Sequence, residues 1–340
     1  MNAHTAPVVN WLAINAAETA RVIETSIRSQ VLSTLKRKGV VLGLSGGIDS
    51  SVVAALCVNA LGPERVLALI MPERECSDDS ERLGHVAANF LQIRTETEDI
   101  TNILEHTGCY RRRDAAIRCL VPEFGPNHKC KLVMANLADG ARYAVPSLIV
   151  QSPDGKQQKL RLTAQTYLEI VAATSFKQRT RKMMEYYYAD RLQYAVAGTP
   201  NRLEFDQGFF VKNGDGTADL KPIAHLYKTQ VYQLAEFFNL PDEIRERPST
   251  TDTFSLSQSQ EEFFFAVPHK TLDLCLYGKN HSIPPSEVAE VTGLNVEHIV
   301  AIYEAIDVKR RATTYLHQYP LLVEDVSEIL GQCTRINSLR

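Results

Sequence analysis

The stretch Val40 to Val53, VVLGLSGGIDSSVV, constrains the fold more than any other part of the chain. A short apolar run leads directly into Ser45-Gly46-Gly47, and a helical pattern opens at Asp49 and Ser50. This order predicts a buried strand, a glycine turn and a helix N-terminus, where unpaired N–H groups and the helix dipole favour an anion. The stretch therefore predicts a phosphate site, and the carboxylate of Asp49 predicts a Mg2+ ion that bridges it to phosphate.

Two glycines alone would favour a strand-to-helix turn that needs them for steric reasons. Hydroxyl donors at Ser45, Ser50 and Ser51, together with Asp49, favour the nucleotide site instead. The string matches neither the Walker A pattern nor the dinucleotide pattern GxGxxG. SGGIDSS resembles the PP-loop of the ATP pyrophosphatases, enzymes that hold the pyrophosphate of ATP while AMP is transferred to a substrate.

Composition places the chain among soluble globular proteins. It has 340 residues, of which 44% are hydrophobic and 23% charged, enough for one large α/β domain with additions or two modest domains. A net charge of −3 gives no broad basic surface, so we expect no nucleic-acid partner. The N-terminus does not read as a signal peptide and no apolar run reaches membrane-span length, so we expect no membrane partner. Seven scattered cysteines without a CxxC pair favour reduced thiols and a cytoplasmic location over disulfides or a zinc site.

Apolar runs and helical patterns alternate along the first hundred residues. Strands alternating with helices predict a doubly wound parallel sheet, with the ligand crevice beyond the carboxyl ends of the strands. The turn at 45–47 and the segment Met71 to Ser80 should therefore face the same crevice. The expected helices are 13–38, 50–61 and 77–91, and the expected strands are 40–44, 65–71 and 93–97.

The alternation breaks between about residues 108 and 163, where we expect an inserted β-hairpin. Its strands are Tyr143–Val150 and Lys156–Leu162, joined through the turn signal Pro153-Asp154-Gly155. The sequence leaves two roles open for this insertion: a structural flap or interface arm, or a cover that shapes the substrate site.

A long helical pattern follows from Ala164 to Asp190 and carries a cationic cluster. A short basic cluster in a net acidic chain favours a phosphate clamp or a solvated face over a nucleic-acid face. The cluster consists of Lys177, Arg179, Arg181 and Lys182.

A second constellation begins with a short strand at Tyr194 to Gly198 and runs through GTPNRLEFDQGFFVKNGDGTADLKPIAHLYKTQ. No helix or strand period explains its mixture of charged and small residues. Together with the PP-loop it resembles the NAD synthetase family, whose members show GTxxxxE, then GFFxKxGDGxxD, then PLxxLxK. KQRTR at 177–181 is similar to the family's KARxR, and MPER at 71–74 to the MPSR loop of glutamine-dependent members. The resemblance covers roughly residues 40–312, without the insertion.

The resemblance implies a single PP-loop domain of the adenine nucleotide alpha hydrolase type over residues 1–340. In that arrangement the insertion occupies about 108–163, and a helical C-terminal part occupies about 260–330. Thr292 to Ile306 would also fit a helix-turn-helix, but a helical cap is the favoured interpretation here.

Carried over to this sequence, the resemblance implies a role for each matching position. The residues expected to contact ATP are Gly43, Leu44, Ser45, Gly46, Gly47, Ile48, Asp49, Ser50, Thr199, Lys228 and Thr250. The residues expected to bind Mg2+ are Asp49 and Glu204. The residues expected to bind the dinucleotide substrate are Arg179, Lys212, Asp219 and Lys309. No covalent nucleophile is implied.

The sequence departs from the family pattern mainly around the expected dinucleotide site. The departures are Ser175 in place of Asn, Ile223 in place of Leu, Gln260 in place of Asp in the lid-like segment Thr250–Glu262, and Val308 in place of His. The nucleotide half is therefore better matched than the substrate half.

The implied activity is that of an ammonia-dependent ligase, which converts deamido-NAD, ATP and ammonia to NAD, AMP and pyrophosphate through an acyl-adenylate. About forty residues precede the PP-loop, too few for an amidase domain, so free ammonia or a separate glutaminase subunit supplies the nitrogen. The family also implies a homodimer. Two alternatives remain open: a related amide ligase that adenylates another carboxylate, and a nucleotide-binding regulatory paralogue without turnover.

Overall fold

A four-stranded parallel sheet in the order β3-β2-β1-β7 forms the centre of the computed structural model, which describes residues 10–134, 146–251, 253–324 and 326. Its strands are β1 Val40–Gly43, β2 Val66–Ile70, β3 Arg94–Thr97 and β7 Ala195–Val196. Strands β1 and β2 lie inside the sheet and are almost entirely apolar, as expected for strands covered on both faces. The strand predicted at 194–198 is observed only as β7, because Ala197 pairs with Leu220 outside the sheet.

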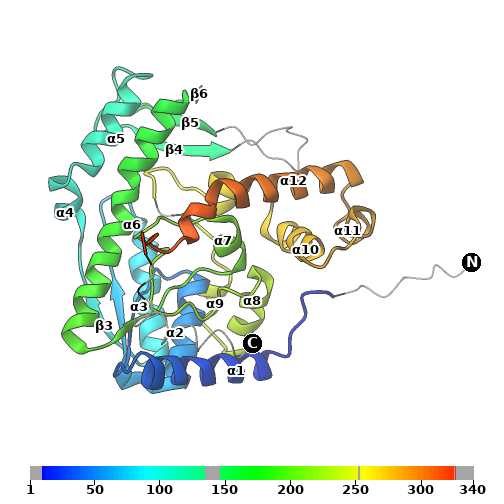
Figure 1. The fold of residues 1–340 in the computed structure, drawn as a ribbon. Coiled ribbons are helices and arrows are strands. Elements are labelled where there is room, and N and C mark those ends of the chain that lie inside the picture. Colours follow the sequence, from blue (N-terminus) through cyan, green and yellow to red (C-terminus); the bar gives the residue numbers. More distant parts are fainter. Residues whose placement is uncertain (1–9, 135–145, 252, 325, 327–340) are drawn as a thin grey trace, which may run out of the picture.

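Helices cover both faces of this sheet, so the predicted doubly wound α/β class is confirmed (Figure 1). Val40 and Leu42 of β1 pack into one apolar cluster, and Val41 between them packs into another on the opposite face. The first cluster is covered by α1 Ala16–Arg28, α2 Ile48–Leu61, α3 Asp78–Leu91, α8 Lys228–Phe237 and α9 Asp242–Arg245. The second is covered by α4 Thr101–His106, α5 Cys109–Arg118 and α6 Ala164–Leu192.

The predicted helices largely match those observed, with one interruption. The helix expected over 13–38 begins at Ala16, runs as α1 to Arg28 and continues as the π-helical segment η1 Ser29–Thr34. Short 3-10 helices η2 Pro63–Arg65 and η4 Thr314–His317 lie at helix ends. No helix in the described ranges is long and apolar enough to cross a membrane.

Within the expected insertion at 108–163, three strands form an antiparallel sheet, here called the inserted sheet, and the predicted hairpin omitted the first of them. The strands are β4 Lys129–Met134, β5 Pro146–Gln151 and β6 Gln157–Arg161, in the order β4-β5-β6. The predicted turn at 153–155 joins β5 to β6, with Gly155 at a φ of 86°. The part of the predicted first strand at 143–145 lies outside the described residues.

Helix α6 links the two sheets. Its 29 residues begin at the N-cap Thr163, whose hydroxyl accepts a hydrogen bond from the Thr166 N–H, and end at Gln193 in the left-handed region. One end of α6 lies beside the small sheet and the other beside the parallel sheet (Figure 1). The two sheets and the loops between them are therefore held on one rigid element.

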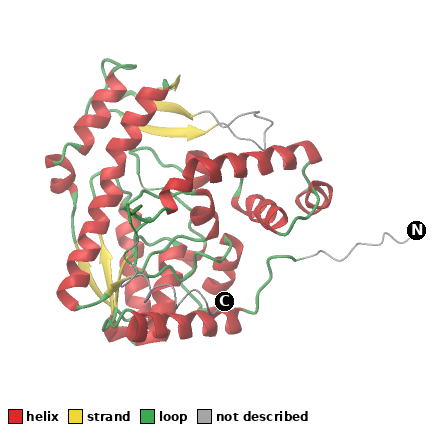
Figure 2. Ribbon diagram, viewed as in Figure 1, coloured by secondary structure: helices red, strands yellow, loops and turns green. Residues whose placement is uncertain are grey.

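The C-terminal part is helical, as predicted (Figure 2). The π-helical segment η3 Glu261–Phe265 is followed by α10 His269–Asn280, α11 Pro285–Thr292 and α12 Val296–Thr313. These helices share one apolar cluster with Leu203 of the short helix α7 Arg202–Gln207. Residues 292–306 thus belong to a packed cap, which agrees with the favoured interpretation.

Candidate active site

A cavity of about 250 Å3 opens beyond the carboxyl ends of β1, β2 and β7. As predicted, the turn after β1 and the loop after β2 both line it. The loop after β2 contributes Met71, Pro72 and Cys76. The convergence follows from topology, since neighbouring parallel strands end at the same edge of a sheet.

The turn after β1 is held by its own hydroxyl groups. Gly47 is the N-cap of α2, and its carbonyl accepts hydrogen bonds from the Ser50 hydroxyl at 3.0 Å and the Ser51 hydroxyl at 2.9 Å. The Ser45 and Ser50 hydroxyl oxygens lie 3.2 Å apart. Ser51 is fully buried and does not line the cavity, so its hydroxyl fixes the turn and does not face a ligand.

Gly46 is required by close packing against α3. Its φ is 70°, and a Cβ atom there would lie 2.6 Å from the Leu83 Cβ and 2.8 Å from the Gly84 nitrogen. Gly46 is not among the residues that line the cavity. The glycine therefore lets the turn sit against α3, while Gly47 presents the helix N-terminus to the cavity.

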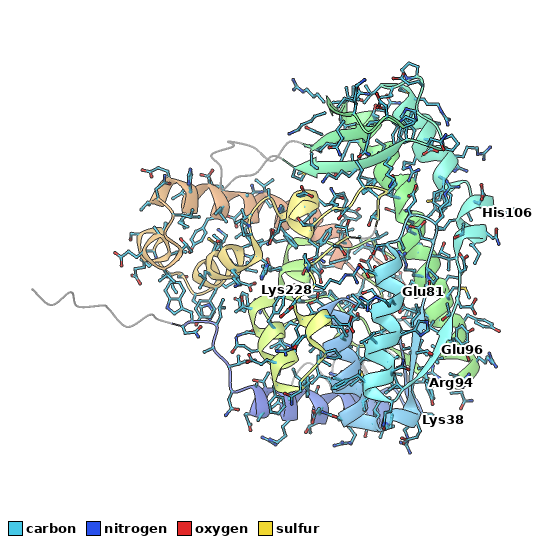
Figure 3. All side chains as sticks on the ribbon, turned by 180° about the vertical axis from the view of Figure 1, so that it is seen from behind. Lys38, Glu81, Arg94, Glu96, His106 and Lys228 are labelled. Carbon is cyan, nitrogen blue, oxygen red and sulfur yellow. The ribbon has the colours of Figure 1, made fainter. Side chains whose placement is uncertain are left out.

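Lys228 and Asp49 form an ion pair in the cavity wall. Lys228, the first residue of α8, is buried, and Asp49 lies in the first turn of α2. The Asn201 amide donates to the other Asp49 oxygen at 3.1 Å. Figure 3 labels Lys228 and Glu81, which approach the cavity from α8 and α3.

Glu204 is the second carboxylate of the cavity. Its Oε2 accepts the Asn201 backbone N–H at 3.0 Å within a capping box that starts α7, and its Oε1 accepts from the Gln260 amide at 3.0 Å. Burial and the nearby Asp49 charge raise the pKa of Glu204 to about 8. A cation between the Asp49 and Glu204 carboxylates would offset the repulsion between their negative charges.

The pair Asp49 and Glu204 suits Mg2+, which is held in nucleotide sites by one or two carboxylates, water and substrate phosphates. Their carboxylates are close enough for the charge of Asp49 to raise the pKa of Glu204. Among the residues that the structure describes, no cluster of three or more His, Cys, Asp or Glu side chains forms a metal cage. The donor set therefore fits a metal completed by phosphate oxygens.

The structure brings together the predicted nucleotide residues and separates the predicted substrate residues from them. All the predicted ATP contacts except Gly46 line the cavity, as does Glu204. The four predicted substrate residues do not line it. Arg179 donates to the Lys212 carbonyl at 3.3 Å, so these two lie together outside the cavity.

The remaining predicted substrate residues have local partners. Lys212 donates to the Tyr315 carbonyl at 2.6 Å. Asp219 accepts the Val196 N–H at 2.7 Å and so holds β7. Lys309 donates to the carbonyls of Phe264 at 2.9 Å and Phe265 at 3.3 Å, and burial lowers its pKa to about 7.

The cationic cluster of α6 is neither a solvated face nor a simple phosphate clamp. Lys177 is fully buried and pairs with Glu73 at 2.8 Å and Glu75 at 2.7 Å. Lys182 is also buried and pairs with Glu185 at 2.5 Å. Of the four cations, Arg181 and Lys182 line the cavity.

Sequence reasoning missed several cavity residues. Arg247 donates to the Ser45 carbonyl at 3.2 Å and to the Ser80 hydroxyl at 2.6 Å, which places a guanidinium beside the turn after β1. Asp215 also lines the cavity, and burial raises its pKa. The GDG string contained Asp215, but no pattern around Arg247 distinguished it from a surface residue.

Comparison with known proteins identifies a matching family model. The model of NAD synthase matches residues 19–122 and 148–313, which leaves β4 between the two matched stretches. An NH3-dependent NAD+ synthetase of Mesorhizobium japonicum is 58% identical over 318 residues, with 93% of this chain and 99% of that protein covered. One of Rhizobium meliloti is 54% identical, with 92% and 93% covered.

Solved structures agree on the fold. The NH3-dependent NAD synthetase of Campylobacter jejuni superposes with a TM-score of 0.61 at 20% identity, and 92% of this chain and all of that chain are covered. An NMN synthetase of Francisella tularensis gives a TM-score of 0.60, also at 20% identity, with the same coverage. Because these identities are low, the two structures support the architecture alone.

Proposed function

This chain belongs to the NAD synthase family, and from that membership we propose that it makes NAD from deamido-NAD, ATP and ammonia. The identity of 58% to an NH3-dependent NAD+ synthetase, over nearly the whole length of both chains, carries the proposal. The chain is thus a C–N bond-forming ligase with ATP as co-substrate, and it releases AMP and pyrophosphate.

The reaction has two steps. The deamido-NAD carboxylate attacks the α-phosphorus of ATP, which forms an acyl-adenylate and expels pyrophosphate. Ammonia then attacks the acyl carbon, the C–O bond to AMP breaks, and the ammonium intermediate loses a proton to give the amide. Neither step needs a covalent bond to the protein, so the site has to position reactants and offset negative charge.

The cavity residues suit the first step. The turn from Gly43 to Ser50 and the N-terminus of α2 would surround the phosphates, with Lys228, Thr199 and Thr250 in contact with ATP. Arg247, Arg181 and Lys182 add positive charge around the same cavity. These groups would stabilise the leaving pyrophosphate.

Asp49 and Glu204 would hold Mg2+, which would supply charge neutralisation for the phosphates when bound. Lys228 would hold Asp49 in place until then, since the two already form an ion pair. Arg179, Lys212, Asp219 and Lys309 remain our proposed contacts for deamido-NAD. We also propose a cytoplasmic homodimer, and the described free cysteines, four of them buried, suit a reducing compartment.

The test is to incubate the purified protein with ATP, Mg2+, ammonium and deamido-NAD and to measure NAD, AMP and pyrophosphate. We expect the three products in equal amounts, with ammonium and without glutamine. AMP release only with other carboxylic acids would contradict the proposal and favour a related ligase. Absence of pyrophosphate release under all conditions would favour a regulatory paralogue.

A further inference from the structure

The cavity is bordered on one side by the rim segment, residues 249–251 and 253–262. Ser249, Thr250, Thr251 and Gln260 line the cavity. Gln260 also donates to Glu204, one of the two proposed magnesium ligands. The position of the rim segment therefore sets part of the nucleotide-binding surface.

Strand β4 of the inserted sheet holds this segment through its open edge. Among the described strands, in the order β4-β5-β6, β4 lies at the edge of the sheet, where its outer backbone groups need other partners. The Cys130 N–H donates to the Ser255 hydroxyl at 2.9 Å, and the Cys130 carbonyl accepts the Leu256 N–H at 3.1 Å. The Gln258 amide, which is buried, donates to the Leu132 carbonyl.

Side chains reinforce this contact. Lys131 donates to the Ser257 carbonyl at 3.2 Å and pairs with Glu262 at 3.1 Å. Phe254 is only 4% exposed and packs into the apolar cluster of the inserted sheet, against residues such as Leu132. The rim segment is thus anchored to the core of the insertion as well as to its edge.

Lys177 ties the same segment to the loop after β2, which also lines the cavity. Its ammonium donates to the Thr253 carbonyl at 2.8 Å while it pairs with Glu73 and Glu75 in the loop after β2. Two segments that line the cavity are therefore joined through one buried cation.

We propose that β4 positions the rim segment for ATP before any ligand binds, which makes Lys131 and Ser255 positioning residues for the amidation. The proposal rests on the proposed function and assigns a purpose to the insertion. Strand β4 lies between the two stretches that the family model matches, whereas the rim segment lies within the second stretch. ATP then binds with a smaller loss of conformational entropy, because the segment is already ordered.

The test compares Lys131→Met and Ser255→Ala with the control Lys159→Met in the full-length protein. Lys159 is exposed on β6 and lies in the same row across the sheet, since Lys131 and Lys159 both pair with Ile149. We measure KM for ATP, kcat, and the rate at which chymotrypsin cleaves next to Phe254 and Phe263, with and without saturating Mg-ATP.

For Lys131→Met and Ser255→Ala we expect KM for ATP to rise about threefold to tenfold, with kcat within about twofold of wild type. Cleavage without ATP should accelerate by a similar factor and return to the wild-type rate with Mg-ATP. Lys159→Met should match wild type in both measurements. The proposal is wrong if Lys131→Met and Ser255→Ala behave like Lys159→Met, or if kcat falls while cleavage is unchanged.

The two proposals fail separately. If the wild-type protein makes no NAD, the proposed function is wrong, but the cleavage rates with and without Mg-ATP still decide whether β4 positions the rim segment. If NAD is made and cleavage is insensitive to Lys131→Met and Ser255→Ala, only the positioning role is wrong.

Discussion

Lys228 and Asp49, 179 positions apart in the chain, form an ion pair in the wall of the cavity beyond the parallel sheet. Burial opposes the charge on Lys228, but Asp49 and Glu204 more than offset it and raise the pKa of the lysine. The first residue of α8 is thereby fixed against the first turn of α2. Either side chain could exchange this partner for a ligand, with Lys228 on a phosphate and Asp49 on a metal ion.

Replacement of Asp49 tests this assignment. We expect Asp49→Asn to lower kcat/KM for ATP by about 100-fold to 1,000-fold, because the charge that holds a metal ion is lost while the shape is kept. The measurement is pyrophosphate release at several Mg2+ concentrations. Asp79→Asn is the matched control, because Asp79 occupies the second position of α3 as Asp49 does in α2, but is exposed. Equal pyrophosphate release from wild type and Asp49→Asn would exclude the metal role.

Gly46 and Gly155 form a second matched pair, since both have positive φ angles but only Gly46 is crowded. Gly155→Ala should cost about 1–2 kcal/mol of unfolding free energy from backbone strain alone. Gly46→Ala should cost about 1–3 kcal/mol more, because the new Cβ would overlap Leu83 and the backbone of Gly84. Urea unfolding measures the stability, and ATP titration should show weaker binding only for Gly46→Ala. Equal effects of the two substitutions would contradict the packing argument.

The sequence predicted the strand, turn and helix at residues 40–61 because these features depend on neighbours in the chain. It also predicted that the turn at 45–47 and the loop at 71–80 meet, since parallel strands end at one edge. The crowding of Gly46 by Leu83 could not be predicted, because Leu83 lies on another helix. Local patterns thus located the cavity but not the contacts that shape it.

Strand β4 and the burial of Lys177 could not be predicted from local pattern. The alternation in KCKLVM is short, and the partners that complete β4 are β5 and the rim segment, which is over a hundred positions away. Lys177 belongs to a basic run that is typical of a solvated helix face. Its burial depends on Glu73 and Glu75, whose position is fixed only when the loop after β2 packs on α6.

The buried pair of Lys177 with Glu73 should be far more sensitive to substitution than an exposed pair. We expect Lys177→Met to destabilise the fold by about 3–5 kcal/mol, because the buried Glu73 carboxylate loses its counterion, whereas Glu75 keeps its pair with Arg113. Arg94→Met, which breaks an exposed pair with Glu96 on β3, should cost less than about 1 kcal/mol. Figure 3 shows that Arg94 and Glu96 lie next to each other at the edge of the molecule. Thermal or urea unfolding compares the two variants, and a loss no larger for Lys177→Met than for Arg94→Met would contradict the argument.

Lys309 gives a pH dependence whose sign follows from its surroundings. Burial lowers its pKa from 10.5 to about 7, so between these values the folded state binds fewer protons than the unfolded state. Its contribution therefore makes stability rise from pH 7 toward 10.5, by up to about 1.4 kcal/mol per pH unit, and its cost is fully present below pH 7.

Lys309→Met should remove this slope, so urea unfolding of wild type and variant at pH 7 and pH 9 should show a smaller rise for the variant. Lys270→Met, at an exposed lysine of α10, should keep the wild-type slope. Lys309 donates hydrogen bonds to the carbonyls of Phe264 and Phe265, which lie two and three positions after the end of the rim segment. If Lys309 also contacts deamido-NAD, the variant should raise KM for that substrate without raising KM for ATP. Identical slopes for wild type and Lys309→Met would mean that the Lys309 ammonium stays charged in the folded protein.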